Sequence, residues 1–170
     1  MKNFLLFFII VMVSACSREK NINDRLEFNN DVDGMAHWTD NPTIVKYNSH
    51  TGKFACRTDS MNQFSLTFRK RMGEITEKPI MRVYISAWIY VNNISADGRF
   101  VCALDSAPGV GYVYLNETFH IKKEREWTKV SSVFYLPKTY NPDFILSSYI
   151  WNTGKEEIYI DDFHIKLTEY

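Results

Sequence analysis

The sequence has 170 residues and a formal net charge of zero at neutral pH, from 20 basic and 20 acidic side chains. A surface that binds nucleic acid needs an excess of Lys and Arg to displace counterions from phosphate, so this balance argues against a nucleic-acid partner. The length suits one domain with a sizeable hydrophobic core.

The N-terminus has the pattern of a secretory signal. A positive start, Met1–Asn3, precedes the apolar run Phe4–Val13, which is far shorter than the roughly 20 apolar residues that a membrane-spanning helix needs. The run closes on Val13-Ser14-Ala15-Cys16, which resembles the lipobox of bacterial lipoproteins. The resemblance implies that residues 1–15 are removed and that Cys16 carries lipid. The alternative is an ordinary signal peptide with an incidental cysteine.

Residues 16–25 are polar and charged and show no core-forming pattern. We therefore expect a short tether that keeps the following domain close to a membrane. Ser17, directly after the cysteine, fits outer-membrane sorting in similar lipoproteins. The resemblance thus implies a lipid-anchored position in the bacterial cell envelope, on the periplasmic or surface side of the outer membrane, with residues 26–170 forming one domain.

From Leu26 onward the chain consists of short segments separated by Gly, Pro, Asn and Asp. This pattern is typical of an all-β sandwich or barrel, and no segment has a convincing helical period. The longest alternation, Met81–Val91, predicts a central strand. Phe64, Leu66 and Phe68 share the apolar face of another predicted strand. The remaining predicted strands are Leu26–Asn29, Lys53–Thr58, Phe100–Asp105, Gly111–Asn116, Trp127–Leu136, Phe144–Trp151 and Glu157–Leu167.

The last predicted strand contains two adjacent carboxylates, Asp161 and Asp162. Successive strand residues point to opposite faces, so strict alternation places Asp161 on the apolar face with Phe163, Ile165 and Leu167. A carboxylate in such a row is costly unless a cation or several donors accompany it. We predict a structural role for Asp161 and a surface position for Asp162, rather than a catalytic pair.

Several short motifs follow the opening strand: Trp38, Ser49–Lys53, Ile85–Tyr90, Glu126–Val130, Tyr149–Asn152 and Tyr159–Phe163. Their order and spacing resemble those of the β-jelly-roll carbohydrate-binding modules and their galactose-binding-domain-like relatives, over nearly all of residues 26–168. The resemblance implies a sandwich of two antiparallel sheets and suggests glycan binding, although a fold does not by itself fix a function.

Modules of this type commonly hold a structural calcium ion, which takes six to eight oxygen ligands. The resemblance implies Asp161 as a side-chain ligand, backbone carbonyls near Gly52 and Lys53, and a ligand from Glu27 or Asn29. The chain departs from the family in the opening strand, where Asn29 replaces the usual Glu and Glu27 comes one place early. The alternative is that Asp161 accepts backbone N–H groups at a strand edge.

Aromatic residues supply the candidate ligand contacts, because their rings can stack on the apolar faces of sugars. The chain has 12 Phe, 10 Tyr and 4 Trp. Tyr112 and Tyr114 would join Tyr149 and Trp151 only if their strands share a sheet. Each aromatic residue could instead be a packing residue, since aromatic side chains are common in strands. The predicted glycan contacts are aromatic residues with two polar companions: Tyr84, Trp88, Tyr90, Trp151, Arg82 and Asn152.

Cys56 and Cys102 would remain in an exported chain, where a disulfide is permitted. The favoured interpretation is that both are small, buried, apolar residues.

No catalytic constellation is recognisable. A glycosidase needs two carboxyl groups at a set separation across a cleft, and no spacing here demonstrates that. The four histidines form no HExxH zinc motif, and no Gly-x-Ser-x-Gly is present. We therefore predict a non-catalytic envelope lipoprotein that binds glycan. The alternatives are a structural or protein-interaction lipoprotein with the same fold, and a small glycan-active enzyme.

Overall fold

The computed structural model describes residues 26–34, 38, 43–46, 48–107 and 110–170. Within these ranges no helix is long and apolar enough to cross a membrane. The signal peptide, Cys16 and the tether lie outside the described residues and stay predictions. The elements are β1 (Glu27–Asn30), β2 (Thr43–Val45), β3 (Ala55–Thr58), β4 (Phe68–Arg71), α1 (Met72–Ile75), β5 (Ile80–Val91), β6 (Gly98–Ala107), β7 (Val110–Phe119), β8 (Thr128–Tyr135), β9 (Ile145–Asn152) and β10 (Ile158–Glu169).

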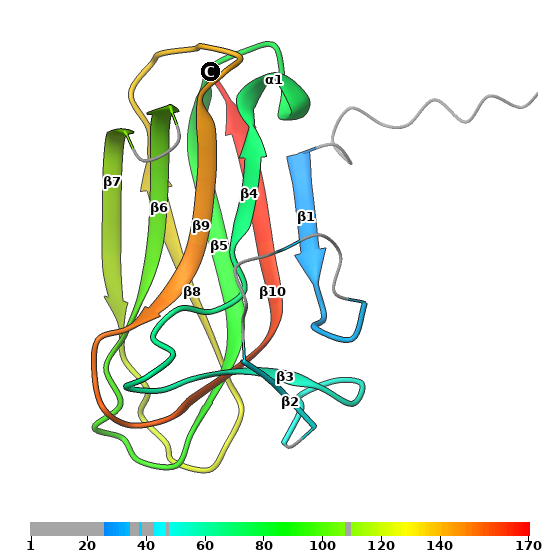
Figure 1. The fold of residues 1–170 in the computed structure, drawn as a ribbon, viewed down its shortest axis with the longest axis vertical. Helices are drawn as coiled ribbons and strands as arrows, with labels where there is room; N and C mark the ends of the chain where they lie inside the picture. Colours follow the sequence, from blue (N-terminus) through cyan, green and yellow to red (C-terminus); the bar gives the residue numbers. More distant parts are fainter. Residues whose placement is uncertain (1–25, 35–37, 39–42, 47, 108–109) are drawn as a thin grey trace, which may run out of the picture.

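Two antiparallel sheets pack face to face (Figure 1). The six-stranded sheet has the order β2-β3-β10-β5-β8, and β1 also pairs with β10. The four-stranded sheet has the order β4-β9-β6-β7. Strand β5 pairs along its length with β10 and β8, which confirms the predicted central strand. The predicted β-sandwich jelly roll is likewise confirmed.

The core lies between the sheets because alternate residues of each strand are apolar and point inward. The residues between them point away from the core, and we call the surfaces that they form the outer faces of the two sheets. The central inward-pointing side chains are buried residues of β5, β6 and β9: Val83, Ile85, Ala87, Ile89, Val91, Phe100, Cys102, Leu104, Leu146 and Ile150.

The two cysteines are both buried and unpaired, Cys56 on β3 and Cys102 on β6. Burial raises the pKa of each thiol to about 12, so both stay protonated at neutral pH. The interpretation of these residues as small apolar core residues is confirmed.

Strand β10 changes face at a bulge, which overturns the predicted position of Asp161. The pairing of β10 with β5 shifts register between Asp161 and His164, and Asp162 has a φ of 45°. The bulge inserts an extra residue, and a one-residue shift reverses the face of every side chain that follows. Ile160 before the bulge and Phe163 after it both join the core. Asp161 pairs instead with Trp88, on the outer face of the six-stranded sheet.

The chain before β4 also departs from strict alternation. Strand β4 begins only at Phe68, and Phe64 forms an isolated bridge to Trp151. Between them the Ser65 hydroxyl replaces a backbone carbonyl of the ladder, because it accepts the Ile150 N–H at 2.8 Å. Phe68 is buried as predicted, whereas Phe64 is 49% exposed and lies on the outer side.

Candidate functional site

The outer face of the four-stranded sheet is built from residues that the strand register places in rows across the sheet. One row runs Arg69, Ser147, Ala103 and Tyr114, from β4 to β7. The next rows towards the end of β9 are Tyr149, Val101 and Asn116, and then Trp151, Arg99 and Thr118. Tyr114 therefore shares a sheet with Tyr149 and Trp151, which is the condition that the sequence left open.

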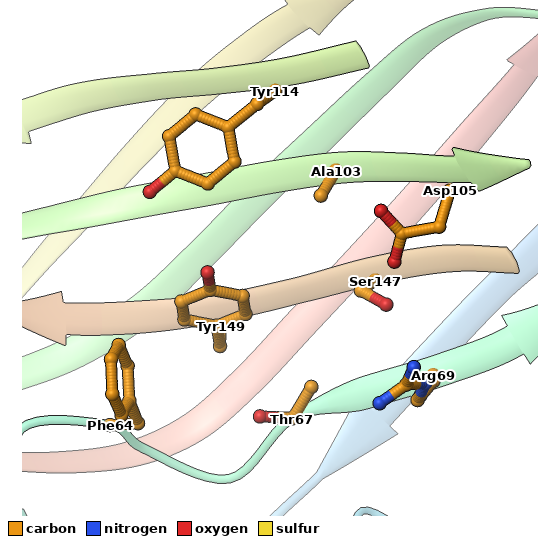
Figure 2. Close-up of a pocket in the computed structure, with 8 residues that line it drawn as sticks. All are labelled: Phe64, Thr67, Arg69, Ala103, Asp105, Tyr114, Ser147 and Tyr149. Carbon is orange, nitrogen blue, oxygen red and sulfur yellow. The ribbon is translucent and has the colours of Figure 1, made fainter. Parts of the chain in front are cut away.

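A pocket of about 350 Å³ lies on this face. Figure 2 shows its wall side chains rising from four strands and from the segment before β4. The described residues that line it are Phe64, Thr67, Arg69, Ala103, Asp105, Tyr114, Ser147 and Tyr149.

Three aromatic rings form the apolar part of the pocket. The Tyr149 ring lies at its centre, with Phe64 on one side and Tyr114 on the other (Figure 2). The Phe64 and Tyr149 ring centroids are 5.7 Å apart at 83°. Tyr114 is 52% exposed, so its ring is accessible from solvent. Accessible rings of this kind can contact a flat apolar ligand surface.

Polar groups occupy the other end of the pocket. The Asp105 carboxylate and the Arg69 guanidinium lie on either side of Ser147 (Figure 2). Burial, the adjacent Tyr114 and the Asp105 charge raise the pKa of Tyr149, so its phenol stays neutral and can donate a hydrogen bond. The pocket thus combines flat apolar surface with donors and a carboxylate acceptor, which suits a ligand rich in hydroxyl groups.

The residues predicted as glycan contacts do not come together. Arg82, Tyr84, Trp88 and Tyr90 lie on the outer face of the six-stranded sheet, on the opposite side of the sandwich. Trp151 lies on the four-stranded sheet, next to the pocket.

Asn152 belongs to neither outer face, because it is fully buried. Its Nδ2 donates to the Glu156 carbonyl at 2.8 Å, and its Oδ1 accepts the Gly154 N–H at 3.0 Å. The side-chain amide thus stabilises the turn between β9 and β10, and its burial keeps it from contacting a ligand.

On the six-stranded sheet, Trp88 and Tyr90 are covered by residues of neighbouring loops. The His50 ring stacks on Trp88 with centroids 3.9 Å apart at 16°. Trp127 packs against both His50 and Tyr90, with centroids 5.7 Å from each. These contacts make Trp88 and Tyr90 half-buried packing residues.

The two adjacent carboxylates of β10 hold the loop that carries His50. Asp161 accepts the N–H groups of His50 at 2.8 Å, Thr51 at 3.0 Å and Asp162 at 2.8 Å. Asp162, predicted on the surface, is half-buried, and its Oδ2 lies 2.6 Å from His50 Nδ1. Its Oδ1 accepts the Thr51 hydroxyl at 2.8 Å. Burial raises the pKa of Asp161, and the N–H bonds oppose that shift.

The residues predicted to hold calcium do not fit that ion as arranged here. The Asp161 carboxylate faces N–H donors, whereas calcium requires oxygen ligands. Glu27 pairs with Lys166, and Asn29 lies beside His164, both beyond the bulge. Among the described residues no group of three or more His, Cys, Asp or Glu side chains is placed to hold a metal. The open alternative, backbone N–H acceptance by Asp161, is the arrangement seen.

The backbone at the other two predicted calcium ligands is also engaged. The Lys53 N–H donates to both carboxylate oxygens of Asp33, at 3.0 and 2.9 Å. The Gly52 carbonyl accepts the Ser49 hydroxyl at 3.2 Å. Gly52 and Lys53 are thus bonded to other protein groups, and the neighbouring His50 and Thr51 present N–H groups to Asp161.

Comparison with solved structures shows proteins whose fold is similar to the β-sandwich described above. No family model matches the chain, and no curated protein matches it. Among solved structures, the CBM22-2 xylan-binding domain of Paenibacillus barcinonensis Xyn10C has a TM-score of 0.55 at 16% identity, over 83% of this chain and 99% of that one. The chain has a carbohydrate-binding-module fold.

Two further structures agree. The C-terminal family 22 carbohydrate-binding module of Clostridium thermocellum Xyn10B has a TM-score of 0.54 at 10% identity, over 82% of this chain and 92% of that one. The CBM22-1–GH10 modules of the same xylanase, complexed with xylohexaose, give a TM-score of 0.52 at 16% identity over 86% of this chain. This chain covers 27% of that structure, which also contains a GH10 module.

Proposed function

We propose that this protein binds a glycan, without cleaving it, in the pocket on the outer face of the four-stranded sheet. The observation that carries the proposal is the combination in one pocket of the rings of Phe64, Tyr114 and Tyr149 with the polar groups of Arg69 and Asp105. The rings offer stacking surfaces, and the charged groups can bond to hydroxyls from opposite directions.

The fold comparison supports this assignment, because similar structures include a xylan-binding domain and modules complexed with xylohexaose. The lining residues support the absence of cleavage. Asp105 is the single carboxylate among the described residues of the pocket, whereas glycoside hydrolysis generally uses two carboxyl groups that flank the bond.

The proposed setting is the bacterial cell envelope, with the domain tethered through lipid on Cys16. The lipobox-like Val13-Ser14-Ala15-Cys16 supports this position. Replacing Cys16 by Ser should move the protein from the membrane fraction to the soluble fraction after cell breakage. Retention of the Cys16→Ser protein in the membrane fraction would contradict the lipid anchor.

Affinity electrophoresis through gels that contain xylan, galactan or β-glucan tests the binding. We expect at least one polymer to retard the protein, and Tyr149→Ala to weaken that interaction about tenfold, or roughly 1.4 kcal/mol. The matched control is Tyr135→Ala, because Tyr135 is 67% exposed on the opposite sheet. Equal weakening by both variants would reject the pocket. If no polymer retards the protein, interaction with an envelope protein becomes the better interpretation.

A further inference from the structure

We propose that the binding face continues beyond the pocket into a second subsite, formed by Arg99, Trp151 and Asn116, that takes the carboxylate of an acidic sugar. The natural ligand would then be a glycan that bears uronic acid. This inference rests on the proposed function, since it names the class of glycan that the same face binds.

The surface from the pocket to Arg99 is continuous. Phe64 contacts Tyr149 inside the pocket and also lies over Trp151, with centroids 6.3 Å apart at 24°. Trp151 is the register partner of Arg99 on the neighbouring strand, and both point to the outer face. A ligand that follows the aromatic residues out of the pocket therefore reaches the Arg99 guanidinium.

Arg99 carries a charge that no carboxylate neutralises among the described residues. Its Nη1 donates to Asn116 Oδ1 at 3.2 Å, and this partner is neutral. Arg57 and Arg71, by contrast, each have a carboxylate partner: Arg57 has Asp59 at 3.3 Å and Glu157 at 3.4 Å, and Arg71 has Asp143 at 3.7 Å. A half-buried guanidinium without a counter-ion, on the residue that pairs with Trp151 in the sheet, is suited to an external anion.

Two neighbouring donors in this subsite also lack acceptors. Arg99 Nε and Trp151 Nε1 are both shielded from solvent and have no hydrogen-bond partner in the described part of the chain. A carboxylate has two oxygens with several lone pairs and can accept from more than one N–H group. Because the Arg99 side chain is long and rotatable, its Nε can turn towards an acceptor that arrives at the surface. A bound carboxylate would supply the missing partner.

The charges along β6 give the bound glycan a direction. Arg99 and Asp105 lie on the same face of this strand, six residues or about 20 Å apart. Asp105 lies near Arg69 at the polar end of the pocket (Figure 2), so the two charges there offset each other. Arg99, beyond the pocket, has only the neutral Asn116 as a partner among the described residues and attracts an anion. Neutral sugar units therefore lie over Tyr149, and the acidic unit lies over Arg99. The planar fork of arginine matches a planar carboxylate, which favours uronic acid over a sulfate ester.

Matched pairs of polymers test the proposal on the full chain. The first pair is glucuronoxylan and the same polymer after reduction of its carboxyl groups to alcohols, and the second is polygalacturonate and its methyl ester. We expect at least one acidic polymer to bind about tenfold more tightly than its uncharged derivative. Equal binding within both pairs would overturn the acidic subsite while leaving neutral-glycan binding intact. Dextran sulfate that binds as tightly as the better acid would also overturn it, as general anion attraction.

Single-residue variants test whether Arg99 causes the preference for the acidic polymer. Arg99→Gln should abolish the preference for the acidic form while the uncharged form still binds, and Arg99→Lys should keep part of it because the charge remains. Arg125→Gln, an exposed arginine on the loop before β8, is the matched control and should keep the full preference. Thermal melting confirms that each variant folds. A preference that survives Arg99→Gln would overturn the assignment. Failure of every polymer with the unmodified protein would instead reject the proposed function, and this inference with it.

Discussion

The two outer faces of the sandwich carry aromatic residues at alternate strand positions, yet their surroundings differ. On the six-stranded sheet, Trp88 lies beneath the His50 ring at 3.9 Å. On the four-stranded sheet, Phe64 and Tyr114 remain about half exposed around a pocket. Both faces thus carry outward-pointing aromatic side chains, and the neighbouring loops decide whether a ligand can reach them.

The covering loop is held by the β10 bulge. Because Asp162 adopts a left-handed conformation, both carboxylates meet the His50–Thr51 segment. The bulge therefore covers the part of the six-stranded face around Trp88, whereas the proposed binding pocket lies on the opposite face. Breaking these contacts should affect stability, and breaking the pocket should affect binding.

The largest effect should come from Asp161→Ala. It leaves three backbone N–H groups without their acceptor, so we expect the free energy of unfolding to fall by about 3–5 kcal/mol. Urea unfolding measures the loss, and a change in tryptophan fluorescence should report that Trp88 is uncovered. Asp161→Asn, which keeps one oxygen acceptor, is the matched control and should lose roughly half as much. Equal stability of Asp161→Ala and the unmodified protein would show that the loop is held by other contacts.

The next effect separates the two faces directly. Trp88→Ala should lower the free energy of unfolding by about 2–3 kcal/mol, because a half-buried stacked ring is lost, while glycan binding persists. Tyr149→Ala should show the reverse, with weakened binding and a smaller change in stability. Affinity electrophoresis and urea unfolding of both variants give the comparison. If Trp88→Ala loses binding at unchanged stability, the ligand lies on the six-stranded face.

Much of the fold was predictable because it depends on local periodicity. The alternation Met81–Val91 specified the central strand and its inward residues, and β5 follows it. Strict alternation predicts the wrong face for Asp161, because a bulge depends on the pairing between strands and leaves no mark in the alternation along one strand.

The pocket was only partly predictable for the same reason. The sequence indicates Tyr114 and Tyr149 as possible partners, but the order β4-β9-β6-β7 that brings them together depends on long-range pairing. Phe64, Leu66 and Phe68 occupy alternate positions, and this regular alternation predicts that all three lie on the apolar face of one strand. The interruption at Ser65 turns Phe64 outward into the pocket. Arg69 and Asp105 had no local signal that set them apart from other charged strand residues.

A smaller effect should distinguish backbone conformation from hydrogen bonding at the bulge. Asp162 has a φ of 45°, a region that Asp and Asn tolerate and β-branched residues avoid. Asp162→Val should therefore be about 1–2 kcal/mol less stable than Asp162→Asn, although both lose the carboxylate that contacts His50. Thermal unfolding of the two variants measures the difference. Equal stability would mean that the bulge relaxes into regular strand pairing.

The smallest expected effect concerns calcium, and it tests whether the loop over Trp88 is held by protein donors alone. The Asp161 oxygens already accept N–H groups of His50, Thr51 and Asp162. A calcium ion there would require the loop to turn carbonyl oxygens inward and would displace those bonds. We therefore expect the Tm to be the same in EDTA and in excess CaCl2. A Tm that falls in EDTA and recovers with calcium would mean that the loop has a second, metal-bound arrangement, in which case Asp161→Asn should remove the response.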